Sequence, residues 1–438
     1  MSNIIKRELE KIEIPKELHE KSKLGVMKAK QERSKSKLKK LVIPVVASAT
    51  ILFSTGVGAA YIPSFNNLIA TISPEIALML QPIGISSESN GIKTEVVAAM
   101  NDNDMAVIYV TLKDLTDDRI DETLELYDYS LTDSHMFNSQ IVDYDKKTNT
   151  VTLRIQGNGG KSLNDKKMNL NISSFLSKKQ TFEAPVDINL SEIAAKSTQT
   201  VQLDMENTPG GGGDMYQKLK EQGVIQVLKP NETKINLPKI QFTHISNIGI
   251  INNHLHIQTK WTKDNVDDHG YFYFVDESGK EIYSSSINFG IDKTGDTVYG
   301  NEYTEYIFDR DNVDFEKQKL QGHFVSNGEY TTGNWNTTFK IQSVQDEISD
   351  NLNMNFETWD SNRFAVSPLG VTLSGNGKFN KSAKIDLRVK MNDGSVQTLD
   401  SRTSFIEDKK IKLKFIPSSP LEISKIKSIL INGKEINI

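Results

Sequence analysis

The feature that most constrains this chain is residues 41–62, LVIPVVASATILFSTGVGAAYI, a run without one charged side chain. As a helix rising about 1.5 Å per residue, it spans roughly 33 Å, and the hydrocarbon core of a bilayer is about 30 Å thick. The segment contains Pro44, several hydroxyl residues and two glycines, which membrane helices tolerate. We therefore expect one transmembrane helix over residues 41–62.

The charges on either side of this run predict its orientation. Residues 1–40 hold 13 Lys or Arg and 6 Glu, a net charge of +7, so the remaining chain carries −12 of the total of −5. Beyond the run, the first Lys is Lys93. Because positive residues beside a span stay in the cytoplasm, we expect a cytoplasmic N-terminus and an extracytoplasmic bulk in a single-pass protein of the cell membrane.

A secretory signal peptide also runs from basic to apolar to small residues, and Gly58-Ala59-Ala60 resembles a cleavage site. The basic region here is 40 residues long, and the apolar run is about twice the length of a signal-peptide core. Both lengths favour an uncleaved anchor.

The basic tail, residues 1–40, is rich in helix-forming residues but has too few apolar side chains to bury a core. Ile5, Leu9 and Ile12 recur at helical spacing, and Leu18 follows them after a proline. This stripe predicts either a solvated tail or a helix that folds into a groove on a cytosolic partner. The basic residues can in addition lie on anionic lipid.

From residue 92 onward, short strands and turns follow one another at about 8 to 12 residues, the pattern of β-sandwiches. NDND at 101–104 predicts a hairpin, Asn432-Gly433 a two-residue hairpin turn, and residues 215–222 a short helix. We expect a mainly β protein with about three immunoglobulin-like sandwich modules. The expected parts are a tail at 1–40, a span at 41–62, a connector at 63–90, module one at 91–207, a linker with a short helix at 208–234, module two at 235–345 and module three at 346–438.

Composition excludes several kinds of site. The chain has no cysteine, so it forms no disulfide, thiolate metal site or lipid-modified cysteine. A large extracytoplasmic part without disulfides fits a Gram-positive envelope. The acidic balance of residues 41–438 argues against nucleic acid as a direct partner.

No motif supports an enzyme. His254 and His256 lie two apart on a predicted strand and could share a metal, but a solvent-exposed strand face is the simpler interpretation. The acidic run from Asp309 lacks the ligand pattern of a calcium loop, and the acidic turn of Asp114, Asp117, Asp118 and Asp121 is typical of a solvated loop. The glycine run at 210–213 is followed by no Lys-Ser or Lys-Thr. We assign no catalytic residue, no metal ligand and no cofactor.

Three stretches resemble one Gram-positive family: EIPKELHEKSKLGVMKAK at 13–30, VTLKDLTDDRID at 110–121 and NWNTTF at 334–339. The family carries a domain of unknown function outside the membrane. It includes membrane-anchored anti-sigma factors, which are negative effectors of extracytoplasmic-function sigma factors.

The resemblance implies a single-pass sensor whose tail sequesters a cytosolic sigma factor through Ile5, Leu9, Ile12 and Leu18, while outer β modules respond to an envelope ligand. It also implies release of the sigma factor by a protease acting near or inside the membrane. The alternative is a membrane-anchored envelope or adhesion protein whose tail only sets topology.

Overall fold

In a computed structural model of the chain, the described residues are 62–438 without 73, 133, 135, 159–161, 165, 187, 195, 263–265, 277, 310, 312, 314–317, 342, 344–346, 381–383 and 400. The chain is mainly β, as expected, and its sheets are built from antiparallel strand pairs. Within this described part, no helix is both long and apolar enough to cross a bilayer. The span expected over residues 41–62 lies outside the described residues, except for Ile62.

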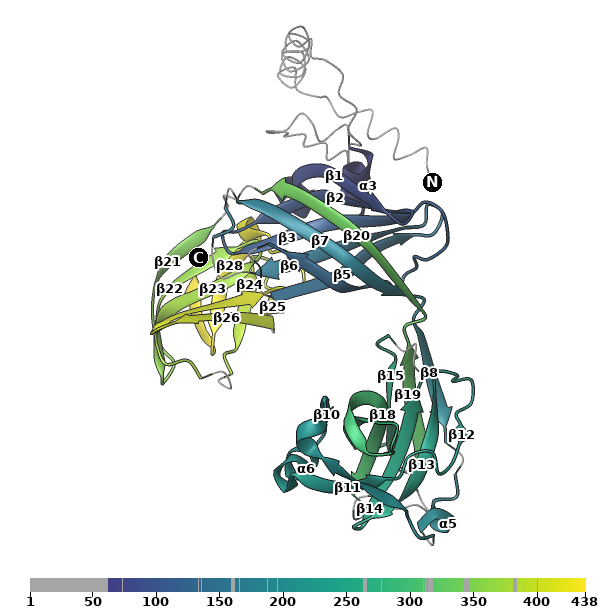
Figure 1. Cartoon of the computed structure of the whole chain (residues 1–438). Coiled ribbons are helices and arrows are strands. Elements are labelled where there is room, and N and C mark those ends of the chain that lie inside the picture. The colour runs from purple at the N-terminus through teal and green to yellow at the C-terminus, as the bar shows by residue number, and fades with distance from the viewer. Residues whose placement is uncertain are drawn as a thin grey trace, which may run out of the picture. The chain divides into compact units, whose positions relative to one another are not determined.

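The chain divides into two units, and the second is inserted into the first. Residues 176–330 form the second unit, whereas residues before and after them together form the first. Figure 1 shows both units as layered sheets, with β20 in light green running beside the teal β7 in the first unit.

Module one is a two-sheet sandwich in the first unit. One sheet has the order β1-β2-β3-β6-β5 and the other β20-β7-β4. Their inner faces share one core, in which Ile108 and Leu153 of the first sheet lie with Leu170 and Trp335 of the second. The strands are β1 Gln81–Ser89, β2 Ile92–Asn101, β3 Met105–Asp114, β4 Glu125–Leu131, β5 Met136–Asp145, β6 Thr150–Asn158, β7 Lys167–Ser177 and β20 Glu329–Lys340.

Strand β20 corrects the expected boundaries. We predicted that NWNTTF would close module two, but β20 joins the sheet of β7 and β4 in module one. Trp335 is 1% exposed, and its indole N–H donates to the carbonyl oxygens of Ser89 and Ile92 at 3.2 and 2.9 Å. Module one also begins at Gln81, inside the expected connector.

Module three closes the chain with the strand order of module one and one additional strand, β25. Its sheets are β21-β22-β23-β27-β26 and β25-β24-β28-β29 around a core of their own. The Asn432-Gly433 turn between β28 and β29 is confirmed, with both φ angles positive at 49° and 81°. The strands are β21 Ile348–Asn355, β22 Trp359–Ser367, β23 Gly370–Gly377, β24 Leu387–Met391, β25 Val396–Thr398, β26 Ser401–Glu407, β27 Lys410–Ile416, β28 Ile426–Ile431 and β29 Lys434–Asn437, with a 3₁₀ turn, η4, at Ile423–Lys425.

The two sandwiches also share a bulge. In module one the pairing of β2 shifts at Val97 toward both β1 and β3, and in module three the pairing of β22 shifts at Asn362 toward both β21 and β23. Counted from these bulges, Asp102 and Ser367 hold the same position in their hairpins, and the two side chains contact each other. The tips of the two hairpins therefore meet through residues in equivalent positions.

Module two, the second unit, has a six-stranded sheet, β10-β17-β18-β14-β13-β12, and a four-stranded sheet, β16-β15-β19-β8. The two-stranded sheet of β9 and β11, with α6, covers the other face of the larger sheet. The elements are β8 Gln180–Pro185, α5 Leu190–Ala194, β9 Thr200–Asp204, η2 Met205–Asn207, β10 Gly210–Gly212, α6 Tyr216–Gln222, β11 Val224–Leu228, β12 Ile235–Asn236, β13 Thr243–Ile251, β14 His254–Trp261, β15 His269–Val275, β16 Glu281–Tyr283, β17 Ser285–Ile291, β18 Thr297–Asp309 and β19 Lys319–Ser326.

Two expectations about this region change. The predicted linker at 208–234 is part of module two, although its short helix is present as α6. The sandwiches also depart from immunoglobulin strand order, in which the second and third strands lie in opposite sheets. Here β2 and β3 pair directly, as do β22 and β23, because their connecting turns are too short to cross between sheets.

Candidate functional site

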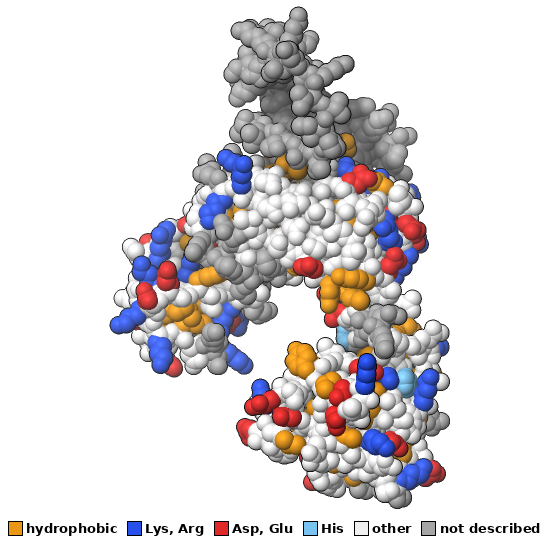
Figure 2. All heavy atoms as spheres, in the orientation of Figure 1, with side chains coloured by type: hydrophobic (Ala, Val, Ile, Leu, Met, Phe, Trp, Pro, Cys, Tyr) orange, Lys and Arg blue, Asp and Glu red, His pale blue; other side chains and the backbone are white. Residues whose placement is uncertain are grey.

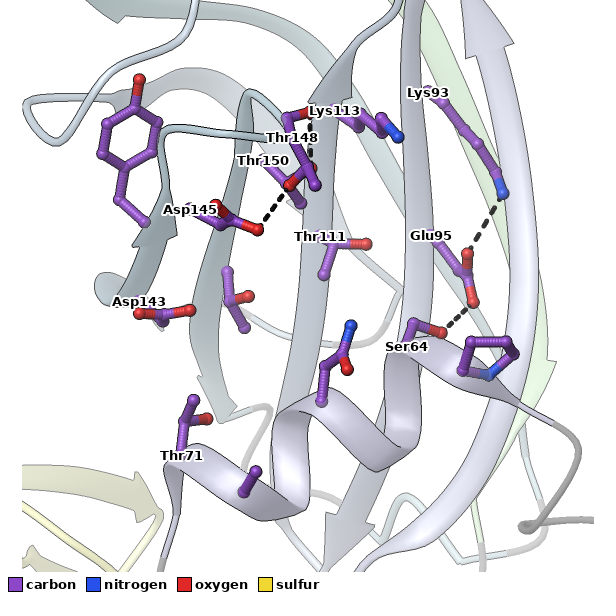
Figure 3. Close-up of a pocket in the computed structure, with 15 residues that line it drawn as sticks. Ser64, Thr71, Lys93, Glu95, Thr111, Lys113, Asp143, Asp145, Thr148 and Thr150 are labelled. Carbon is purple, nitrogen blue, oxygen red and sulfur yellow. Dashed lines mark hydrogen bonds and ion pairs between the residues drawn. The ribbon is translucent and has the colours of Figure 1, made fainter. Parts of the chain in front are cut away.

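A polar groove lies between helix α3, Pro63–Thr71, and the outer face of the first sheet of module one. Pro63 occupies the first turn of α3, where its missing N–H costs no hydrogen bond. Phe65 and Leu68 are 7% and 3% exposed because they pack onto the sheet. The side of α3 next to these two residues faces the groove with polar side chains, including Ser64 and Thr71 (Figure 3). A second helix, α4 Pro74–Met79, follows.

The floor of the groove consists of two rows of side chains across four strands. One row is Glu95, Thr111, Thr152 and Asp143, which are neighbours in the register of β2, β3, β6 and β5. The row beside it, in the same strands, is Lys93, Lys113, Thr150 and Asp145. The volume of the groove is about 710 Å³, within the range of sites that hold small molecules.

Hydrogen bonds hold part of this surface in place. Ser64 Oγ donates to Glu95, whose other oxygen lies 3.2 Å from Lys93 Nζ (Figure 3). Thr148 Oγ1 donates to Asp145 at 2.8 Å, and this bond together with the Lys147 N–H lowers the pKa of Asp145. The Asp145 carboxylate therefore remains negative at neutral pH.

Other groups in the groove are available to a ligand. Lys113 and Asp143 project into the groove from β3 and β5 (Figure 3), and neither side chain forms a hydrogen bond or ion pair with another described residue. No His lines the groove in the described structure. Hydroxyls between charges of both signs suit the binding of a polar ligand by hydrogen bonds.

The predicted partner-binding residues Ile5, Leu9, Ile12 and Leu18 lie outside the described residues. The described residues contain no group of three or more His, Asp or Glu arranged to hold a metal ion.

The strand-face interpretation of His254 and His256 is wrong for His256. Its side chain is 4% exposed, and Nδ1 lies 2.6 Å from Glu305, which is fully buried. Both Glu305 oxygens also accept from the Leu228 N–H at 3.1 Å. The two-stranded sheet of β9 and β11 covers this face of the larger sheet. A local pattern in β14 does not reveal that cover.

The acidic turn at Asp114 is held together by protein donors. Arg119 binds Asp114 through Nε and Nη2 at 2.9 and 2.8 Å, and the backbone N–H groups of Thr116, Asp117 and Arg119 donate to the same carboxylate. Although burial opposes the charge, these hydrogen bonds hold the pKa of Asp114 far below its usual range. The turn is therefore a structural ion pair rather than a purely solvated loop.

Sequence reasoning did not find the groove, because its floor comes from four strands whose register is not local in sequence. The period-two alternation of LRIQ and KTEVV gives only the faces of single strands. In Figure 2, Lys and Arg side chains lie among Asp and Glu side chains wherever charges gather on the visible face, so charge alone singles out no site there.

No family model matches the chain, and no curated protein matches it. One solved structure, the crystal structure of the conserved domain protein from Bacillus anthracis, covers 81% of this chain and 77% of its own at 10% identity and a TM-score of 0.30. A likeness at that score supports no conclusion about fold or function.

Proposed function

We propose that the chain is a single-pass membrane sensor and anti-sigma factor. The observation that carries the proposal is the charge asymmetry about residues 41–62, with +7 on one side and −12 on the rest. The family resemblance supports the same role. In this proposal residues 1–40 hold an extracytoplasmic-function sigma factor at the membrane and cover its surface for core RNA polymerase.

The apolar stripe of the tail is the proposed contact surface. Ile5, Leu9, Ile12 and Leu18 fill a groove of the sigma factor, and the surrounding Lys and Glu residues orient the complex. Release follows cleavage of the anchor, whose proline and small residues ease local unwinding of a helix.

The β modules are the proposed sensing part, and the groove beside α3 is the proposed place for an envelope ligand. Helix α3 starts at Pro63, directly after the apolar segment. A ligand that binds both α3 and the sheet stabilises their contact, and this contact is the part of the described structure nearest in sequence to the anchor.

A two-hybrid assay of residues 1–40 against the sigma factors of the host tests the tail. We expect one sigma factor to bind, Leu9→Asp to abolish binding, and Ser34→Asp, which adds the same charge away from the stripe, to leave it intact. Equal effects of the two variants, or no bound sigma factor, would sink the anti-sigma role and leave the adhesion alternative. A reporter active only outside the cell, fused to Ile438, tests the topology separately.

A further inference from the structure

The outer face of the four-stranded sheet of module two carries a cluster of three tyrosines, of which Tyr271 and Tyr283 are exposed and Tyr273 is half-buried. Tyr273 pairs with Tyr283 across β15 and β16, and Tyr271 pairs with His323 across β15 and β19. The ring centroids of the three tyrosines are 5.7 to 6.0 Å apart, and the Tyr271 and His323 rings stack at 5.0 Å. We call these four residues, with Glu183 and Glu281, the tyrosine face.

The tyrosines are not needed for the core of module two. Their neighbours Phe272 and Phe274 point inward and are fully buried, whereas Tyr271 and Tyr283 are 38% and 57% exposed. In a strand, alternate residues face opposite sides of the sheet. The sequence GYFYFV therefore places aromatic side chains on both faces of the sheet, although the core needs them on the inner face alone. A contiguous exposed aromatic patch is typical of a binding surface.

Two carboxylates flank the rings. Glu183 Oε1 lies 2.5 Å from His323 Nδ1, and its Oε2 accepts from the Tyr273 hydroxyl at 3.3 Å. Glu281 accepts from the Tyr283 hydroxyl, and that bond raises the pKa of Tyr283 to about 12. Burial raises the pKa of Tyr271, and the charges of Glu183 and Glu281 raise it further.

This face therefore has a negative potential over electron-rich rings. Lys319 lies on the same side of the sheet and pairs with Val275, one row of paired residues beyond Tyr273. Each glutamate has oxygen lone pairs left, since a carboxylate accepts about four hydrogen bonds, and the Glu183 side chain is 60% exposed.

We propose that the tyrosine face binds a basic peptide segment. Lysine or arginine side chains of the peptide lie over the Tyr271 and Tyr283 rings, where the ring quadrupole attracts a cation. The charges of Glu183 and Glu281 complement those of the peptide, whereas a polyanion is repelled and a neutral glycan gains little from them. The proposal does not depend on the tail or on a sigma factor.

The experiment measures binding of a fluorescein-labelled octapeptide of alternating arginine and glycine by fluorescence anisotropy. The full chain is held in phosphatidylcholine nanodiscs, whose lipid carries no net charge, at low ionic strength. We expect Tyr271→Leu with Tyr283→Leu to weaken binding by about five- to tenfold, and Glu183→Gln or Glu281→Gln by about threefold each. Salt should weaken binding further.

Matched controls separate the face from general attraction to an acidic protein. Tyr299→Leu removes a ring that is 70% exposed elsewhere in module two, and Glu221→Gln removes an exposed charge from α6. Both controls should bind the peptide as the wild type does. Absence of wild-type binding, equal losses in the controls, or full competition by neutral chitohexaose would overturn the proposal.

Discussion

Lys414 Nζ lies 2.5 Å from Asp102 Oδ2, although the two residues are 312 positions apart. Both side chains are almost fully buried, at 2% and 3% exposure. Asp104 lies 3.3 Å from the same ammonium group and 2.5 Å from Lys412 Nζ. Two lysines of module three thus neutralise two aspartates at the tip of the β2–β3 hairpin of module one. A buried ion pair fixes the geometry of a junction more than it stabilises it, because desolvation offsets much of the attraction.

Breaking this pair should loosen the junction. Lys414→Met leaves Asp102 buried without its cation, and we expect a loss of about 3 to 5 kcal/mol in the free energy of unfolding. Lys412→Met is the control, because this side chain is 32% exposed and its loss should cost about 1 kcal/mol or less. Hydrogen exchange of the β23 and β27 amides measures both. Equal protection in the two variants would show that burial does not set the strength of the junction.

The junction should also depend on pH. Burial opposes the charges, but Lys414 and Lys412 hold the pKa of Asp104 below its ordinary value, and the two aspartates hold the pKa of Lys414 above its own. The Asp104 contribution is fully present above about pH 4, the unfolded pKa, and is lost as the pH falls through the lower folded value. We therefore expect acid to increase exchange at β27 in the wild type. In Asp104→Asn this acid-dependent step should be missing.

Asp114 should stabilise module one through its hydrogen bonds. The side chain accepts from Arg119 and from three backbone N–H groups, and its pKa is far below its usual range. Asp114→Ala should lower the free energy of unfolding by about 3 kcal/mol at pH 7, because these donors lose a charged acceptor. Glu122→Ala, which changes an exposed acidic residue in the loop after this turn, should cost about 0.5 kcal/mol or less. The difference should shrink as the pH falls through the lowered pKa of Asp114, and a denaturation series over pH measures it.

Local features of the fold could be predicted from sequence, because turn chemistry acts over a few residues. The NDND hairpin, helix α6 and the Asn432-Gly433 turn are all present. The partner of β20 could not be predicted, since Trp335 fills a core whose other residues lie mainly before position 176. The same holds for Lys414 and Asp102, which meet only because modules one and three pack together.

The candidate groove could not be predicted either, because it also depends on residues that are far apart in the sequence. Its rows need the register of four strands, and a shift of one residue in any strand would turn that strand's side chains to the other face. The sequence GYFYFV was the one local signal for a functional face. Consecutive aromatic residues in a strand alternate between its two faces, so they cannot all point inward. This alternation places Tyr271 and Tyr273 on one side but does not reveal Tyr283 or His323, which come from other strands.

Helix α3 should be the first element of module one to open. It contacts the sheet mainly through Phe65 and Leu68, and Ser64 adds one hydrogen bond to Glu95. Phe65→Ala should destabilise the docked helix by about 3 kcal/mol and remove the hydrogen-exchange protection of the α3 amides, while the β3 amides stay protected. Asn67→Ala, on the groove side, should leave both unchanged. Loss of β3 protection in the Phe65 variant would mean that α3 and the sheet unfold together.

Because module two is inserted into the first unit, we predict that module two can be removed without unfolding that unit. Its two ends are adjacent, because Ser177 and Gly328 are bridged, while Asn169 contacts Asn336 farther along β7 and β20. Replacing residues 178–328 by Asn-Gly should therefore join these strands in a tight hairpin and keep the core around Trp335. We expect hydrogen-exchange protection of β3 and β6 close to that of the full chain. The control keeps module two and carries Trp335→Ala, which removes the largest core side chain of module one, so the protection of β3 should fall. If the chain without module two also loses protection in β3, the first unit needs the inserted module to fold, and the nested arrangement is not two independent units.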